Sequence, residues 1–181
     1  MEEGHDSWYA AVLANLKKGG PVCQGAAAYI EQHGTPIGFA RQSTGARWTV
    51  RGAIELNPVY YPPGMDPSSP RLLGAVVHEA THLEQGLAHA LTVEGEVAGW
   101  RAEFDARAEL GAAIPSPHWR TVAQTPTPPT RANLRIARAA IRQMTSYRYL
   151  IWLLPLKTNI LTRLIGRMAE RIWTRAQQHF S

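Results

Sequence analysis

The alternation of apolar and polar residues divides the chain into a helical beginning, a short β region and a largely helical remainder. Apolar residues recur at helical spacing over 7–33, and a Gly-Gly-Pro sequence at 19–21 interrupts them, so two consecutive helices are expected there. Over 36–57, apolar residues alternate with polar or small ones and glycines punctuate the run, which predicts two or three short strands joined by tight turns. Residues 58–69 contain four prolines and are expected to form a loop.

Two helices with clear start signals are predicted after this loop. Ser69 followed by Pro70 marks the first start, because serine favours the N-cap and proline fits the first helical position. This helix should span about 70–85 and carry an apolar stripe. Thr92 is expected to cap the second helix, which should span about 93–113.

Charge separates the last third of the chain from the rest. Residues 1–119 hold eight Lys or Arg and thirteen Asp or Glu, whereas 120–181 hold eleven Lys or Arg and a single acid, Glu170. A proline-rich spacer (TPTPPT) precedes this basic region, which should be helical and broken near Pro155. We therefore predict a domain over 1–119, a linker over 120–130, and a basic amphipathic helical extension over 131–181.

Composition excludes several classes of protein. The 181 residues suffice for one domain with an appendage, and 45% hydrophobic with 18% charged residues excludes a disordered chain. A single cysteine, Cys23, excludes an internal disulfide framework and a cysteine-based zinc cluster, so any metal must be held by His and carboxylates. The start of the chain shows no secretory signal and no run of about 18 apolar residues occurs, so we expect a cytoplasmic protein, with attachment to a membrane surface left open by the basic extension.

Residues 78–82 (HEATH) form an H-E-x-x-H pattern on the predicted 70–85 helix. His78 and His82 are one helical turn apart, so their imidazoles can converge on one metal ion. Glu79 lies at the edge of the same face, close enough to act on a water bound to the metal as a general base. The pattern predicts a catalytic metal centre, although two histidines on a solvent-facing helix would also produce it.

A third protein ligand is expected from the residues that follow. Glu96, on the predicted 93–113 helix, is the favoured candidate because a carboxylate would complete a His2Glu site, and the small residues Ala98 and Gly99 would let the two helices approach closely. Glu94 is the second candidate and His89 the third. Zn²⁺ is the expected metal, although two His and one carboxylate can also hold Fe(II).

Three short motifs together resemble the gluzincin type of zinc metallopeptidase in a minimal form: residues 78–82 (HEATH), 84–86 (EQG) and 96–100 (EVAGW). The resemblance implies His78, His82 and Glu96 as zinc ligands and Glu79 as the base. It also implies that residues 54–58 (IELNP) form an edge strand above the zinc. Many gluzincins have an acid or Asn four residues after the ligand Glu, where this chain has Trp100.

The expected fold is therefore α+β: a small zincin-like domain with a short antiparallel sheet, an HExxH helix and a glutamate helix behind it, plus the basic helical extension. The expected function is a zinc-dependent metallopeptidase that hydrolyses a peptide bond of a peptide or protein through a metal-activated water, with Glu79 as general base. Tyr60, Tyr61 and His118 are the candidates for stabilising the oxyanion. The alternatives are a non-catalytic metal-binding domain and an adaptor that binds through its basic helices.

The basic extension itself allows three interpretations. Arginines recur about every four residues at 131, 135, 138 and 142 and again at 163, 167, 171 and 175, opposite apolar positions, and residues 147–156 (YRYLIWLLPL) are apolar with aromatics. Such helices could pack their apolar faces on the front domain or lie on an anionic membrane surface. Nucleic acid is the least favoured partner, because no helix-turn-helix, RNP or zinc-finger pattern is present.

Overall fold

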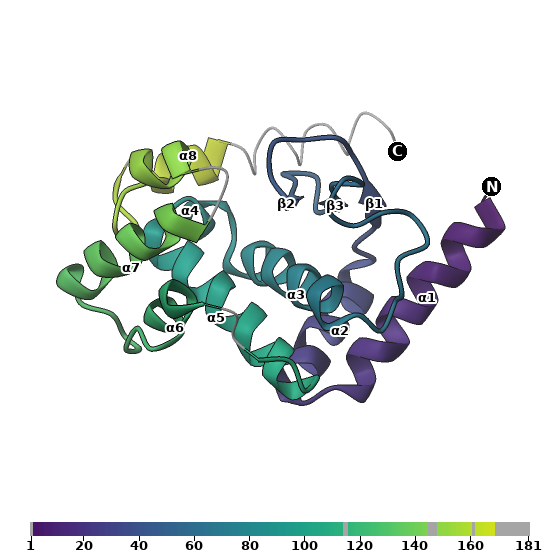
Figure 1. The fold of residues 1–181 in the computed structure, drawn as a ribbon. Coiled ribbons are helices and arrows are strands. Elements are labelled where there is room, and N and C mark those ends of the chain that lie inside the picture. Colours follow the sequence, from purple (N-terminus) through teal and green to yellow (C-terminus); the bar gives the residue numbers. More distant parts are fainter. Residues whose placement is uncertain (1, 114–115, 145–147, 161, 169–181) are drawn as a thin grey trace.

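The computed structural model of the chain describes residues 2–113, 116–144, 148–160 and 162–168. Within these ranges the fold is α+β, as expected, with one small sheet at the edge of a mainly helical body (Figure 1). The predicted arginines at 171 and 175 and the apolar residues beside them lie outside the described residues. Among the described helices, none combines the length and the hydropathy needed to span a bilayer.

Helices α1 (Glu2–Lys18) and α2 (Pro21–His33) form the predicted helical beginning, and the chain changes direction at the Gly-Gly-Pro sequence between them. Gly20 occupies the N-cap of α2 and has no side chain with which to cap it. The carboxylate of Glu109 replaces that cap, because it accepts hydrogen bonds from the backbone N–H groups of Val22 at 2.9 Å and Cys23 at 3.0 Å. The acid that caps α2 therefore comes from a helix more than eighty residues later in the chain.

The sheet has three short strands, β1 (Ile37–Phe39), β2 (Ala46–Trp48) and β3 (Ile54–Leu56), in the order β1-β3-β2. β2 pairs with β3 antiparallel, but β1 pairs with β3 parallel, so the expectation of a purely antiparallel sheet was wrong. The cause is the loop over 40–45, which crosses the end of β3 and is held there by Asn57, whose amide donates to the carbonyls of Gln42 and Thr44.

β3 consequently takes the middle of the sheet. The expectation that residues 54–58 form an edge strand beside the metal was wrong, because β3 has a neighbour on each side. β2 is the edge strand that runs alongside the next helix, α3.

Helices α3 (Pro70–Gln85) and α5 (Val93–Glu109) correspond to the two predicted helices with start signals, and the short helix α4 (Leu87–Ala90) joins them. Ser69 occupies the N-cap of α3 but its side chain makes no capping hydrogen bond, whereas Oγ1 of Thr92 accepts from the backbone N–H of Gly95 at 2.9 Å. The first two N–H groups of α5, those of Val93 and Glu94, bind the carbonyls of residues 155 and 156 at 2.8 and 3.1 Å. The segment after α8 therefore satisfies donors that a helix N-terminus leaves free.

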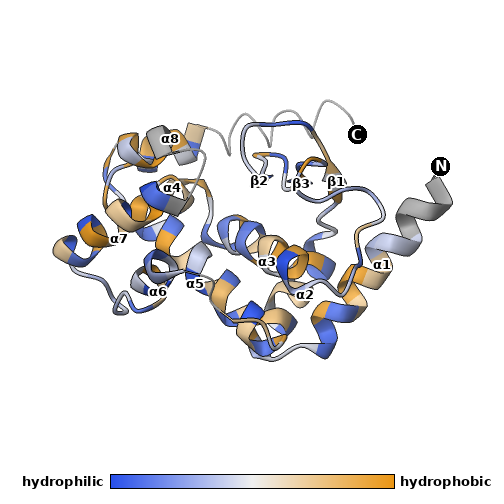
Figure 2. Cartoon of the chain, viewed as in Figure 1, coloured by the Kyte–Doolittle hydropathy of each residue, from blue (hydrophilic) through white to orange (hydrophobic). Residues whose placement is uncertain are grey.

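Two hydrophobic clusters lie on opposite sides of α5. The first is formed mainly by α1, α2, the sheet and α3, with Leu16, Ile54 and Leu72 among its fully buried members. The second joins Phe104 of α5 to Leu134 and other residues of α6 (Pro117–Ala123), α7 (Arg131–Met144) and α8 (Arg148–Leu153). The helices of the basic region thus pack through one apolar face on the rest of the molecule (Figures 1 and 2).

Candidate metal centre

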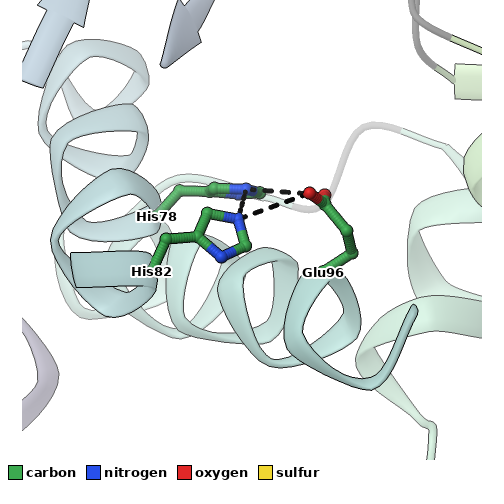
Figure 3. A group of neighbouring side chains, drawn as sticks. All are labelled: His78, His82 and Glu96. Carbon is green, nitrogen blue, oxygen red and sulfur yellow. Dashed lines mark hydrogen bonds and ion pairs between the residues drawn. The ribbon is translucent and has the colours of Figure 1, made fainter. Parts of the chain in front are cut away.

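Three side chains from α3 and α5 point toward one another and could hold a metal ion (Figure 3). The Nε2 atoms of His78 and His82 are 3.0 Å apart, and the carboxylate oxygens of Glu96 lie 3.9 Å from Nε2 of His78 and 3.6 Å from Nε2 of His82. Ligands that bind zinc tetrahedrally at 2.0–2.1 Å are about 3.3 Å from one another. The three distances bracket that value, so small side-chain movements suffice to place all three ligands around one ion.

The close approach of α3 and α5 depends on Gly99, which lies directly beneath the two imidazoles. A Cβ at this position would lie 3.0 Å from Nε2 of His78 and 3.1 Å from Nε2 of His82. The helix spacing of four residues aligns the histidines, and the absence of a side chain at Gly99 leaves the space that they and an ion require. The expectation that small residues let the two helices approach is confirmed at this position.

Glu103 contacts the opposite side of the His78 ring. Its Oε2 lies 3.2 Å from Nδ1 of His78, and its Oε1 lies 3.1 Å from Nη2 of Arg107. A carboxylate at Nδ1 favours the tautomer that carries its proton there, which leaves Nε2 free to bind a metal. Sequence reasoning assigned Glu103 no role at the site. The sequence feature that could have indicated a role for Glu103 is its spacing, seven residues or two helical turns after Glu96 on the same face of the helix.

Trp100 occupies the position where the resemblance led us to look for an orienting acid. Its indole instead packs edge-on against the imidazole of His78, with ring centroids 4.8 Å apart and an interplanar angle of 84°. The aromatic ring thus restricts the tilt of the imidazole, and the carboxylate of Glu103 lies beside its Nδ1.

Glu79 is 7% exposed and lines the same cavity as the three candidate ligands. Burial raises the pKa of Glu79 to about 7, the carboxylates of Glu96 and Glu103 act in the same direction, and His78 opposes the rise. A hydrogen bond from the backbone N–H of Trp48 in β2 also lowers the pKa and ties the carboxylate to the edge strand. A carboxylate with a pKa near neutrality is suited to accept and return a proton.

The two imidazoles differ in their affinity for a proton. Burial lowers the pKa of His78, but Glu103 and the neighbouring carboxylates outweigh it and raise the pKa to about 9. The pKa of His82 is lowered well below its ordinary value, first by burial and then by the charge of His78. Two imidazole nitrogens 3.0 Å apart cannot both be protonated at low cost, and a divalent cation between them would replace the proton.

The other candidate third ligands point elsewhere. Oε1 of Glu94 lies 3.3 Å from Nζ of Lys157, and Nδ1 of His89 lies 3.4 Å from Oγ1 of Thr158. Within the described part of the chain, neither joins the group formed by His78, His82 and Glu96, whose ligand atoms all lie within 4.8 Å of one another. The structure therefore brings Glu96 to the imidazoles, and Glu94 and His89 remain outside.

A cavity of about 800 Å³ opens beside these residues. β2 forms part of one wall, including Ala46 and Trp48, and Trp100 lines another part. Tyr60 and Tyr61 also line the cavity, whereas His118 is exposed on α6 and does not. Of the three candidates for stabilising an oxyanion, the two tyrosines thus have access to the space where a substrate could bind.

No family model, no curated protein and no solved structure matches this chain. What the centre does must therefore be argued from the positions and chemistry of its own residues.

Proposed function

We propose that this protein is a zinc-dependent metallopeptidase of gluzincin type. The observation that carries the proposal is the position of Glu79, a buried acid bordering the same cavity as a group that offers two imidazoles and one carboxylate. Three protein ligands leave a fourth position for water, which is the composition of a catalytic zinc site rather than a closed structural one. A site whose only purpose was to pin two helices together would need neither the cavity nor Glu79.

His78, His82 and Glu96 would hold the ion, which when bound lowers the pKa of water and acts as a Lewis acid. Glu79 accepts a proton from the attacking water and returns it to the nitrogen of the leaving amine. The N–H of Trp48 orients the Glu79 carboxylate during both transfers. Tyr60 and Tyr61 supply the hydroxyl groups of the cavity wall that could donate to the developing negative charge on the carbonyl oxygen.

The substrate that suits this cavity is a peptide or protein segment in extended form. β2 is an edge of the sheet and borders the cavity, so a substrate backbone could lie beside it. This role belongs to β2 and not to residues 54–58, which the sheet order places in the middle strand.

Metal content and peptide hydrolysis together test the proposal. We expect purified wild-type protein to hold one equivalent of zinc by elemental analysis, and His82→Ala to lose it. Wild-type protein, but not Glu79→Gln, should cleave members of a peptide library detected by mass spectrometry. Iron in place of zinc, or a zinc-loaded protein that cleaves no peptide in such a library, would argue against the assignment.

One observation favours a second candidate, a non-catalytic metal-binding domain. Both imidazoles are buried, as in closed structural zinc sites. Cobalt substitution separates the two: a site that keeps water changes its visible spectrum when a competing anion such as cyanide is added, whereas a closed site with four protein ligands does not.

A further inference from the structure

The C-terminal end of the described chain exposes a concentration of large apolar side chains. Six lie within residues 152–168, each between 41% and 78% exposed: Trp152, Leu153, Ile160, Leu164, Ile165 and Met168. Elsewhere in the described residues, large exposed apolar side chains are scattered. So many exposed apolar side chains in one short stretch of the chain depart from ordinary surface composition. We call these six residues, together with Arg163 and Arg167, the C-terminal face.

The helical residues 160 and 162–168 pack on the rest of the described chain through one side. Asn159 and Thr162 cap the start of this helix through reciprocal hydrogen bonds of 2.9 and 3.0 Å. Thr162 and Gly166 are buried, and a Cβ at Gly166 would lie 3.1 Å from Cβ of Ala88 in α4, so this side packs tightly on the rest of the molecule. Packing against the rest of the molecule therefore explains why Thr162 and Gly166 are buried. It does not explain the exposed apolar side chains on the outward side of the helix.

The outward side carries two parallel stripes. Ile160, Leu164 and Met168 follow one another at intervals of four residues and form an apolar stripe, and Arg163 and Arg167 form a basic stripe next to it. An exposed helix with apolar and cationic stripes side by side has the composition of helices that lie at the boundary between lipid headgroups and acyl chains.

Trp152 in α8 is a second site where an exposed apolar side chain lies beside arginines. Its indole is 60% exposed, yet the guanidinium carbons of Arg138 and Arg142 lie 5.8 and 4.9 Å from the ring centroid. Two arginines thus flank an exposed tryptophan, the residue type that is enriched at membrane–water interfaces.

The charge of this region favours an anionic partner. No Asp or Glu occurs between residues 110 and 169, while nine Lys or Arg do. Nucleic acid would also satisfy these cations, but phosphate contacts make no use of exposed Leu, Ile and Met side chains. An anionic bilayer accommodates both the cations and the exposed apolar side chains, because apolar side chains enter the acyl boundary while arginines remain with the headgroups.

We propose that the C-terminal face binds the surface of an anionic lipid bilayer. The apolar stripe, Trp152 and Leu153 enter the interfacial region, and Arg163 and Arg167 contact the acidic headgroups. The protein then lies on the membrane rather than across it, in keeping with the absence of a membrane-spanning helix from the described ranges. This inference does not depend on the metal centre or on its activity.

Vesicle flotation with the full chain tests this inference. We expect wild-type protein to float with phosphatidylcholine vesicles that contain phosphatidylglycerol, not with phosphatidylcholine alone, and less at high salt. Arg163→Gln with Arg167→Gln should weaken partitioning about 25-fold, because each interfacial arginine contributes about fivefold. Leu164→Ser with Met168→Ser should weaken it at least about tenfold.

Matched controls make comparable substitutions at exposed residues outside the C-terminal face. Val50→Ser with Val59→Ser removes two other exposed apolar side chains, and Arg41→Gln with Arg51→Gln removes two other exposed arginines. Both controls should partition within about twofold of wild type. All substituted residues are exposed, so circular dichroism and thermal melting should confirm an unchanged fold.

Three results would overturn the inference. The first is equal binding of wild-type protein to vesicles with and without the anionic lipid, or a loss of vesicle binding in the control variants as large as in the variants of the C-terminal face. The second is a dimer that Leu164→Ser with Met168→Ser dissociates in the absence of lipid, which would assign the face to a second copy of the chain. The third is binding to duplex DNA or RNA that is tighter than vesicle binding and that survives loss of the apolar stripe.

Discussion

Oε2 of Glu103 lies 3.2 Å from Nδ1 of His78, on the opposite edge of the imidazole from the nitrogen that faces Glu96. The histidine is therefore held between two carboxylates of one helix, of which Glu96 would bind the ion and Glu103 would orient the ring. Arg107, 3.1 Å from the other oxygen of Glu103, fixes the orienting carboxylate in turn. This chain of contacts makes the position of His78 a property of the packing of α3 against α5.

Removing the orienting carboxylate should weaken metal binding without removing a ligand. We expect Glu103→Gln to lower zinc affinity roughly 10–100-fold, measured by competition with a chromogenic chelator. Glu94→Gln is the matched control on the same helix, since Glu94 pairs with Lys157 outside the centre, and its zinc affinity should equal that of wild type. Equal affinities for Glu103→Gln and wild type would show that the 3.2 Å contact has no orienting role.

Removing the proposed base should separate metal binding from chemistry. We expect Glu79→Gln to retain a full equivalent of zinc and to lose at least about 100-fold in the rate of peptide hydrolysis, because no carboxylate remains to accept the proton of water. Glu84→Gln, an exposed acid on the same helix, should hydrolyse peptides at the wild-type rate. Normal hydrolysis by Glu79→Gln would assign the base to another residue.

A single methyl group added at Gly99 should displace the imidazoles. The new Cβ of Gly99→Ala would lie 3.0 Å from Nε2 of His78, and we expect zinc affinity to fall at least about tenfold as the rings move apart. Gly25→Ala in α2 is the control, because its Cβ would meet nothing within 4 Å. The control should keep its zinc and gain about 0.5–1 kcal/mol in the free energy of unfolding, measured with urea.

The capping carboxylate of Glu109 should make stability depend on pH. Burial raises its pKa, but the backbone N–H groups of Val22 and Cys23 outweigh this and hold the pKa below its ordinary value of 4.5. A carboxylate whose pKa is lower in the folded state stabilises the fold above the unfolded-state pKa, and the stabilisation disappears as the pH falls through the folded-state value.

We therefore expect wild type to exceed Glu109→Gln by about 1 kcal/mol in unfolding free energy at neutral pH. The difference should shrink once the pH falls below the ordinary carboxyl pKa of 4.5. Urea unfolding of wild type and Glu109→Gln from neutral to acidic pH measures this difference in unfolding free energy. A difference that stays constant down to strongly acidic pH would show that the charge of Glu109 does not act as the cap.

Local signals predicted the longer helices and most of the candidate centre, because each signal acts within one or two turns, whereas the short helices α4 and α6 were not expected. Pro70 predicted the start of α3, and the spacing of His78 and His82 predicted their convergence. Local signals could not predict the order of the strands, since three-residue strands carry too little pattern to specify their neighbours. The hydrogen bonds from Asn57 to the loop between β1 and β2 join residues more than ten positions apart. Sequence spacing puts Glu103 on the same helical face as Glu96, but its contact with His78 depends on how α5 packs against α3, which no local pattern specifies.

The carbonyls of residues 155 and 156 accept the first two N–H groups of α5, two positions before Glu96. A protein shortened before these residues would leave that turn of helix without its acceptors, and the turn would fray at the very place from which the glutamate reaches the imidazoles. The arginine-rich end of the chain thus stabilises the helix turn that carries Glu96, in addition to forming the C-terminal face. Removing this end of the chain would therefore be expected to weaken the metal binding proposed for His78, His82 and Glu96.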